Sequence, residues 1–147
     1  MTKPSLRLAV VLMALTSPLL LAQQASSPAA ATKAPAFKAH VLTVSELNAL
    51  IAKPDQLLFL DVRRPDEVTS IGGFPVYLSV QLAELEKSLA WIPKDRTIVT
   101  VSNHAARAGR AADLLSSKGF KVAGAVGAES YEQDGGTIAH VKPPAKP

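Results

Sequence analysis

The sequence contains no cysteine among its 147 residues. This absence excludes disulfide bonds, thiolate metal ligands and any cysteine nucleophile. A small domain without such cross-links has to derive its stability from an apolar core. The composition allows one, because 48% of the residues are hydrophobic and 19% are charged.

A strong charge bias is also absent. The formal net charge is +4, but Lys3 and Arg7 lie in the first 22 residues, which contain no acid. The remaining chain has 14 basic residues against 12 acidic ones. Nucleic acids and anionic membranes require clustered positive charge. The sequence therefore predicts no nucleic-acid partner.

Patterns typical of metal and nucleotide sites are missing as well. The three histidines, His40, His104 and His140, are scattered along the chain. The glycine pairs at 72–73 and 135–136 are isolated and do not form a phosphate-binding glycine fingerprint. We therefore expect neither a metal ion nor a cofactor.

The N-terminal 22 residues have the pattern of a secretory signal peptide. A short basic start is followed by the apolar run 8–15, a break at Pro18 and a small residue at Ala22. The run is shorter than the roughly 20 residues that span a bilayer. We expect cleavage near Ala22 and a periplasmic or secreted protein without a stable membrane span. A permanent anchor is the alternative.

The rest of the chain divides by composition. Residues 23–39 are rich in Gln, Ser, Ala and Pro and are predicted to form a flexible tether. Residues 40–140 carry the periodic apolar segments of one folded domain. Residues 141–147 contain three prolines and are predicted to be a disordered tail.

Strand-like and helix-like segments alternate through the domain, which predicts a parallel sheet covered on both faces. In such sheets, sites form at the carboxyl ends of strands. Here these ends follow Val62 and Val101. The expected strands are 57–62, 76–80, 96–101 and 120–123, and the expected helices begin at Thr43 and cover 65–70, 82–91 and 105–118.

The segment LDVRRPDE lies at 60–67, and an apolar strand, a loop and an alanine-rich helix follow one another at 98–120. Both segments resemble the rhodanese-like (sulfurtransferase homology) domain family. Residues 60–67, LDVRRPDE, resemble the signature that follows the family's second strand. Residues 98–120 resemble its active-site strand, six-residue loop and alanine-rich helix. The resemblance implies a three-layer α/β/α fold with a central parallel sheet.

The same resemblance places Ser102 where sulfurtransferases of the family carry their cysteine. A serine oxygen cannot carry transferable sulfane sulfur, and its alcohol is hardly ionised near neutral pH. Ala105 stands where active relatives usually have a glycine. Sulfur transfer by the family mechanism is therefore excluded, and the chain is expected to be a pseudoenzyme.

The loop still has features of an anion-binding site. Its amides and the following helix N-terminus favour negative charge. We expect Arg107 to hold an anion oxygen or to pair with Asp61, while Arg63 points to the same edge. The predicted ligand-binding loop is Ser102, Asn103, His104, Ala105, Ala106 and Arg107, supported by Asp61 and Arg63.

Each of these side chains also has a structural interpretation. Ser102 and Asn103 can satisfy loop amides or cap the following helix. Asp61 and Arg63 can form an ion pair that joins strand ends. Ser102 and His104 could instead form a hydrolase nucleophile and base, although they are too close in sequence to converge easily.

The sequence therefore favours an exported, non-catalytic module that binds a small oxyanion or an envelope protein partner. One alternative is an enzyme that acts on a small oxyanion or on a sulfur or phosphate ester. Sulfur transfer with a partner-supplied cysteine is another. A structural domain whose loop has no ligand is the last.

Overall fold

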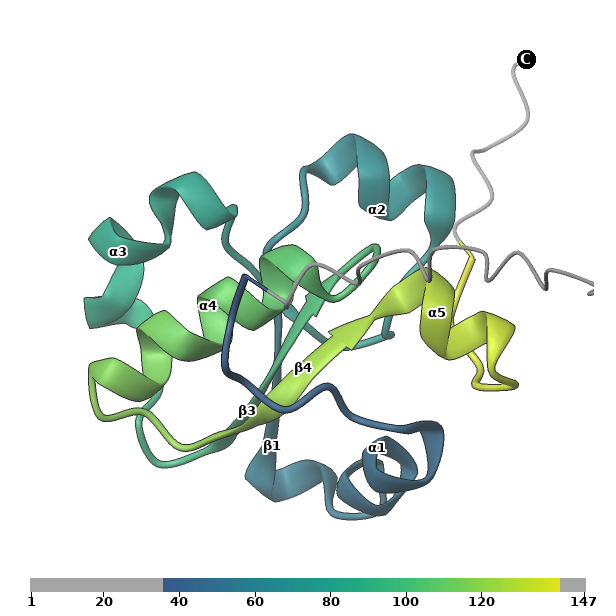
Figure 1. Cartoon of the computed structure of the whole chain (residues 1–147), viewed down its shortest axis with the longest axis horizontal. Coiled ribbons are helices and arrows are strands. Elements are labelled where there is room, and N and C mark those ends of the chain that lie inside the picture. Colours follow the sequence, from purple (N-terminus) through teal and green to yellow (C-terminus); the bar gives the residue numbers. More distant parts are fainter. Residues whose placement is uncertain (1–35, 141–147) are drawn as a thin grey trace, which may run out of the picture. The chain divides into compact units, whose positions relative to one another are not determined.

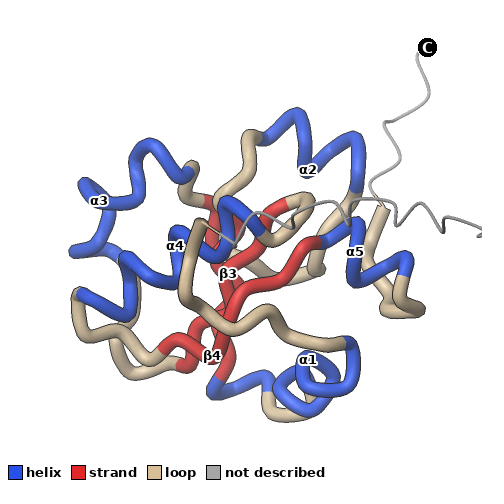
Figure 2. The backbone as a smooth tube through the Cα atoms, viewed as in Figure 1, coloured by secondary structure: helices blue, strands red, loops and turns tan. Residues whose placement is uncertain are grey.

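The computed structural model describes residues 36–140, which fold around a four-stranded sheet. All neighbouring strands are parallel, in the order β2-β1-β3-β4 (Figures 1 and 2). The predicted parallel sheet is thereby confirmed. The strands are β1 (Leu57–Asp61), β2 (Leu78–Ser79), β3 (Thr97–Ser102) and β4 (Val122–Gly127).

Helices cover both faces of this sheet. In Figure 1, α1 and α5 lie on one side of the strands, and α3 and α4 lie on the other. This is the three-layer α/β/α arrangement that the sequence predicted. The helices are α1 (Val44–Ile51), α2 (Pro65–Ile71), α3 (Leu85–Ser88), α4 (Ala106–Ser117) and α5 (Ala128–Gln133).

Burial on both faces explains why the strands read as continuous apolar runs. Val99 and Val101 of β3 belong to the core cluster that contains Leu47 of α1 and Tyr131 of α5. Ile98 belongs to the opposite cluster, with Leu115 of α4. All three β3 side chains are fully buried.

Strand register brings the predicted functional segments together. Leu60 lies opposite Thr100, and Asp61 lies opposite Val101, so β1 and β3 end at the same edge. On the other side of β3, Ser102 lies opposite Gly127 of β4. The ends of the strands predicted at 57–62 and 96–101 thus lie side by side, as expected for a parallel sheet.

The helix predicted over 82–91 is instead three short pieces: a 3₁₀ turn at Leu82–Glu84, α3, and a second 3₁₀ turn at Leu89–Trp91. The segment is tied down at its start, where the Leu82 amide donates to the Val62 carbonyl at 3.2 Å. Short 3₁₀ turns are frequent at helix termini and in connecting segments.

The fourth strand is longer than its sequence predicts. The prediction covered 120–123, whereas β4 extends to Gly127 and leads directly into α5. Gly124 and Gly127 weaken the strand pattern because glycine has low β-propensity. Close packing explains Gly124, since a Cβ there would lie 2.7 Å from the His40 carbonyl oxygen.

Part of the predicted tether packs against the domain. A Cβ at Gly109 of α4 would overlap the Phe37 ring, so this glycine makes room for it. The Lys38 amide donates to the Asp113 carboxylate at 2.8 Å. Residues 37 and 38 therefore pack on the domain, although they precede the predicted boundary at residue 40.

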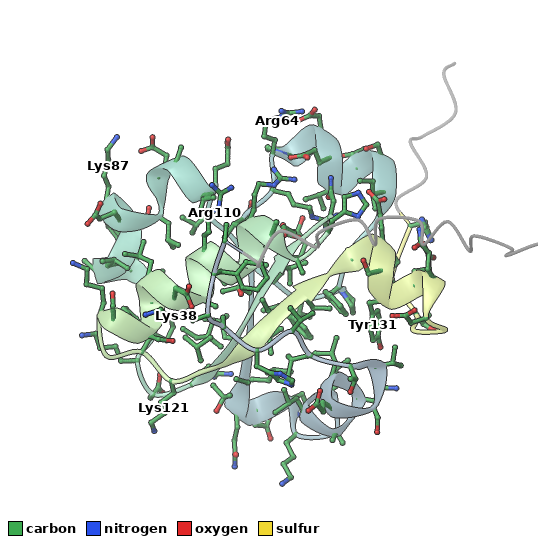
Figure 3. All side chains as sticks on the ribbon, in the orientation of Figure 1. Lys38, Arg64, Lys87, Arg110, Lys121 and Tyr131 are labelled. Atoms are coloured by element: carbon green, nitrogen blue, oxygen red, sulfur yellow. The ribbon has the colours of Figure 1, made fainter. Side chains whose placement is uncertain are left out.

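The predicted signal peptide, the rest of the tether and the tail lie outside the described residues. Among residues 36–140, no helix has the length and hydropathy needed to cross a bilayer. Basic side chains are spread around the domain: Figure 3 shows Arg64, Lys87 and Lys121 projecting from well-separated parts of the ribbon.

Candidate functional site

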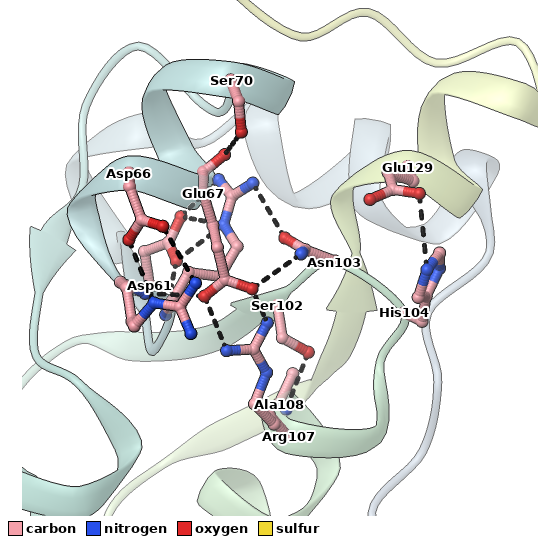
Figure 4. Close-up of polar contacts among 12 residues, drawn as sticks. Asp61, Asp66, Glu67, Ser70, Ser102, Asn103, His104, Arg107, Ala108 and Glu129 are labelled. Carbon is pink, nitrogen blue, oxygen red and sulfur yellow. Dashed lines mark hydrogen bonds and ion pairs between the residues drawn. The ribbon is translucent and has the colours of Figure 1, made fainter.

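Ser102 ends β3 and lies inside the protein. Its relative exposure is 1%. Its Oγ accepts a hydrogen bond from the Ala108 amide at 3.0 Å (Figure 4). The hydroxyl thus satisfies one of the free N–H groups in the first turn of α4. This supports the capping interpretation of Ser102.

The loop after Ser102 makes a tight left-handed turn. Ala105 has a φ of +50° and is the one non-glycine residue with positive φ in the described part of the chain. A Cβ is disfavoured in this conformation, at a cost of roughly 1–2 kcal/mol. This explains in physical terms why a glycine suits the position that Ala105 occupies.

Strand β4 holds the loop from the other side. A Cβ on Gly127 would lie 2.8 Å from both the Ala105 amide nitrogen and the Asn103 carbonyl oxygen. The Glu129 amide donates to that same carbonyl at 3.2 Å. The loop backbone therefore rests directly on the end of β4.

Asp61 and Arg63 form a buried ion pair. Their exposures are 1% and 0%. Arg63 Nη2 donates to Asp61 Oδ2 at 2.7 Å, and Nε donates to Oδ1 at 3.0 Å. Arg63 Nη1 also lies 3.4 Å from the Asn103 side-chain oxygen on the neighbouring strand's loop. Asp61 and Arg63 therefore form the ion pair that the structural interpretation of the sequence expected.

Glu67 is the site residue that the sequence reasoning missed. It lies in the first turn of α2, and its carboxylate accepts from Arg107 Nη1 at 2.8 Å and from Nη2 at 2.6 Å. It also accepts from Asn103 Nδ2 at 3.0 Å and from the Arg64 amide at 3.0 Å. One carboxylate therefore ties α2 to both ends of the loop.

Arg107 pairs with a carboxylate that the sequence did not predict as its partner. Arg107 was expected to hold an anion oxygen or to pair with Asp61, but its guanidinium binds Glu67. The reason is that Arg63 already occupies Asp61. The available signal was the acidic first turn of the helix predicted at 65–70, which contains Asp66 and Glu67.

The ion pair shifts the protonation of Glu67. Hydrogen bonds from Arg107, and then the one from the Arg64 amide, lower the pKa of Glu67 from its usual 4.5 to about 2. Glu67 correspondingly raises the pKa of Arg107. Across the described residues, every buried side-chain nitrogen and oxygen atom has a hydrogen-bond partner.

We expect Glu67→Gln to lower the free energy of unfolding at pH 7 by about 1–2 kcal/mol. This loss is smaller than the pKa shift alone implies, because water screens a partly exposed ion pair. The depressed pKa stabilises the wild type above about pH 4.5, and this advantage is lost as pH falls toward 2. Urea unfolding of both proteins across this range measures the difference.

The matched control is Glu84→Gln, which removes an exposed carboxylate paired with Lys87. It should change stability by less than about 1 kcal/mol at pH 7. A stability gap between Glu67→Gln and wild type that stays constant from pH 5 to pH 2 would contradict the assignment.

The His104 side chain pairs with Glu129 and forms no hydrogen bond with Ser102. The side chain of His104 is 70% exposed, and Nε2 lies 3.4 Å from Glu129 Oε2. The Ser102 hydroxyl is engaged with the Ala108 amide instead. The nucleophile and base of a serine hydrolase are therefore not assembled here.

The described geometry can be compared with known proteins. A family model described as "Rhodanese-like domain" matches residues 43–133. No curated protein matches the chain. A rhodanese-related protein from Thermoplasma volcanium shares 22% identity and a TM-score of 0.60, with 68% of this chain and 97% of that one covered.

Two further solved structures have the same fold. A possible tyrosine phosphatase from Rhodopseudomonas palustris shares 23% identity and a TM-score of 0.58, with 69% and 85% of the two chains covered. A thiosulfate sulfurtransferase from Pseudomonas aeruginosa shares 25% identity and a TM-score of 0.55 over 69% of this chain. The matched region is 20% of that longer protein.

These matches agree with the α/β fold around a parallel sheet described above. The family model spans more than half of the chain and includes every residue of the loop and of the two ion pairs. The chain has no cysteine anywhere. It belongs to the rhodanese-like domain family.

Proposed function

We propose that the chain is a non-catalytic rhodanese-like binding module. The proposal rests on Ser102. This residue is buried, and its Oγ accepts a hydrogen bond from the Ala108 amide. In the alignment inferred from the sequence, this residue replaces the family's cysteine. A buried alcohol without a base is a poor nucleophile.

The enzymatic alternatives have less support. A partner's cysteine or persulfide would need access to the position of Ser102, which is 1% exposed. A hydrolase would need a base beside the hydroxyl, whereas His104 is next to Glu129. A transferase acting on an oxyanion would need free cationic groups, and both arginines of the site are paired.

The same pairing favours a protein partner over a small oxyanion. Asp61 neutralises Arg63, and Glu67 neutralises Arg107. A free oxyanion at the loop would meet two carboxylates and would have to displace one of them. We propose that the partner is a protein of the cell envelope, because residues 1–22 have the pattern of an export signal.

A thiol at position 102 tests whether the loop is closed. We expect the Ser102→Cys thiol to react with iodoacetamide at least about tenfold more slowly than Ser116→Cys, because a buried thiol is inert. Ser102 is buried and Ser116 is exposed. Mass spectrometry of both variants, alkylated at pH 7, gives the two rates.

Equal rates, or faster reaction at position 102, would indicate an open site that activates a thiolate. That result would return the chain to the candidate enzymes. Thermal unfolding of both variants, recorded beforehand, ensures that the rates are compared between folded proteins.

A further inference from the structure

A groove of about 480 Å³ opens at the start of β1. Leu57 and Phe59 of the strand form part of its wall, together with Phe74, Ile51 and Val76. The 102–107 loop lies at the other end of β1, where Asp61 pairs with Val101. The volume falls in the range of roughly 300–1,000 Å³ that is usual for small-molecule sites.

The groove exists because the sheet edge is open there. Strand β2 pairs with β1 only from Leu60 onward, so residues 57–59 have β3 on one side and no described strand on the other. Leu57 and Phe59 are only partly buried, while Leu60 is fully buried. At the rim, Val76 is 80% exposed and Ile51 is 38% exposed. An aliphatic ligand would remove this apolar surface from water.

One charged residue lines the groove. Arg96 is exposed, and its side chain forms no hydrogen bond or ion pair with any other described residue. In this it differs from Arg63, Arg64 and Arg107, each of which is paired with a carboxylate. A free guanidinium beside an apolar surface complements a ligand with a carboxylate head and an aliphatic chain.

We propose that the groove binds a linear aliphatic carboxylate. The chain lies along Leu57, Phe59 and Val76, and the carboxylate pairs with Arg96. This inference does not depend on the proposed function, because the groove shares no residue with the loop or its ion pairs. Either idea can fail without the other.

The test is a titration of the ¹⁵N-labelled full chain with decanoate below its micelle concentration. We expect saturable chemical-shift changes at residues 57–59 and 76, with little change at 102–107. Affinity should rise about twofold to fourfold for each methylene added from octanoate to decanoate, because each added CH₂ buries more apolar surface. Decyltrimethylammonium should bind more weakly than decanoate.

Two variants locate the head group. Arg96→Gln should weaken decanoate binding about fivefold to tenfold and leave decanol binding unchanged, because only the carboxylate loses a charge-assisted hydrogen bond. Arg110→Gln removes another exposed arginine, on α4, and should change neither. Val76→Asp, at a site exposed enough to tolerate it, should also weaken decanoate binding.

Several results would overturn the proposal. These are the absence of saturable shifts in the groove, equal binding of the decyl cation and decanoate, or equal decanoate affinity for wild type and Arg96→Gln. Thermal unfolding of each variant shows that a loss of binding is not a loss of fold.

Discussion

Replacing Arg63 by methionine is expected to lower the free energy of unfolding by about 3–5 kcal/mol. The substitution keeps a long apolar stem but leaves the Asp61 carboxylate buried without its cation. Asp61 accepts two side-chain hydrogen bonds at 3.0 Å or less from Arg63, and the ion pair is shielded from water. Urea unfolding at pH 7 measures the loss.

Arg64→Met is the matched control. Arg64 is the next residue and is also paired, with Asp66, but both of those side chains are more than 60% exposed. Its removal should cost less than about 1 kcal/mol. A double substitution, Asp61→Leu with Arg63→Met, should recover part of the loss because no buried charge remains. Similar costs for the two single arginine substitutions would show that burial does not set the strength of the Asp61 pair.

The second large effect is expected from Gly127→Ala, which should cost about 2–3 kcal/mol and displace the 102–107 loop. The added Cβ would meet backbone atoms of Asn103 and Ala105, which cannot move aside as a flexible side chain can. Urea unfolding gives the cost. Amide chemical shifts of residues 103–105 report the displacement.

Gly135→Ala separates crowding from backbone strain. Gly135 has a φ of +93° and open space around its missing Cβ, so alanine there costs only conformational strain, about 1 kcal/mol. It should leave the loop shifts unchanged. If Gly127→Ala is no more costly than Gly135→Ala and the loop shifts stay in place, the loop does not rest on β4 as described.

The fold follows from local features of the sequence. Residues 57–62 and 96–101 are apolar runs of strand length, and 105–118 has a helical apolar face ended by Gly119. These segments became β1, β3 and α4 with small boundary changes. The end of β4 was harder to predict. Its glycines, Gly124 and Gly127, are required by close backbone packing and give no strand signal in the sequence.

The candidate site was only partly predictable. Adjacent strand ends brought Asp61, Arg63 and the loop together, as parallel topology requires. The role of Glu67 depends on how α2 packs against the start of α4, which a linear pattern does not encode. Its pairing with Arg107 changes the chemistry of the loop, because it neutralises the charge that an oxyanion would need.

The groove was not predicted at all. Nothing in the pattern of residues 76–80 shows that β2 covers only the last part of β1. The open edge at 57–59 is a consequence of this short pairing. Features of this kind come from the register and length of neighbouring strands, which sequence periodicity describes poorly.

The most direct test of the central claim is cyanide-dependent turnover of thiosulfate by the purified full chain, with a cysteine-containing rhodanese as positive control. A non-catalytic module should give no thiocyanate above the protein-free blank, because the chain has no thiol to carry sulfane sulfur. Turnover that rises in proportion to the concentration of the chain, and that is lost in Ser102→Ala, would contradict the account.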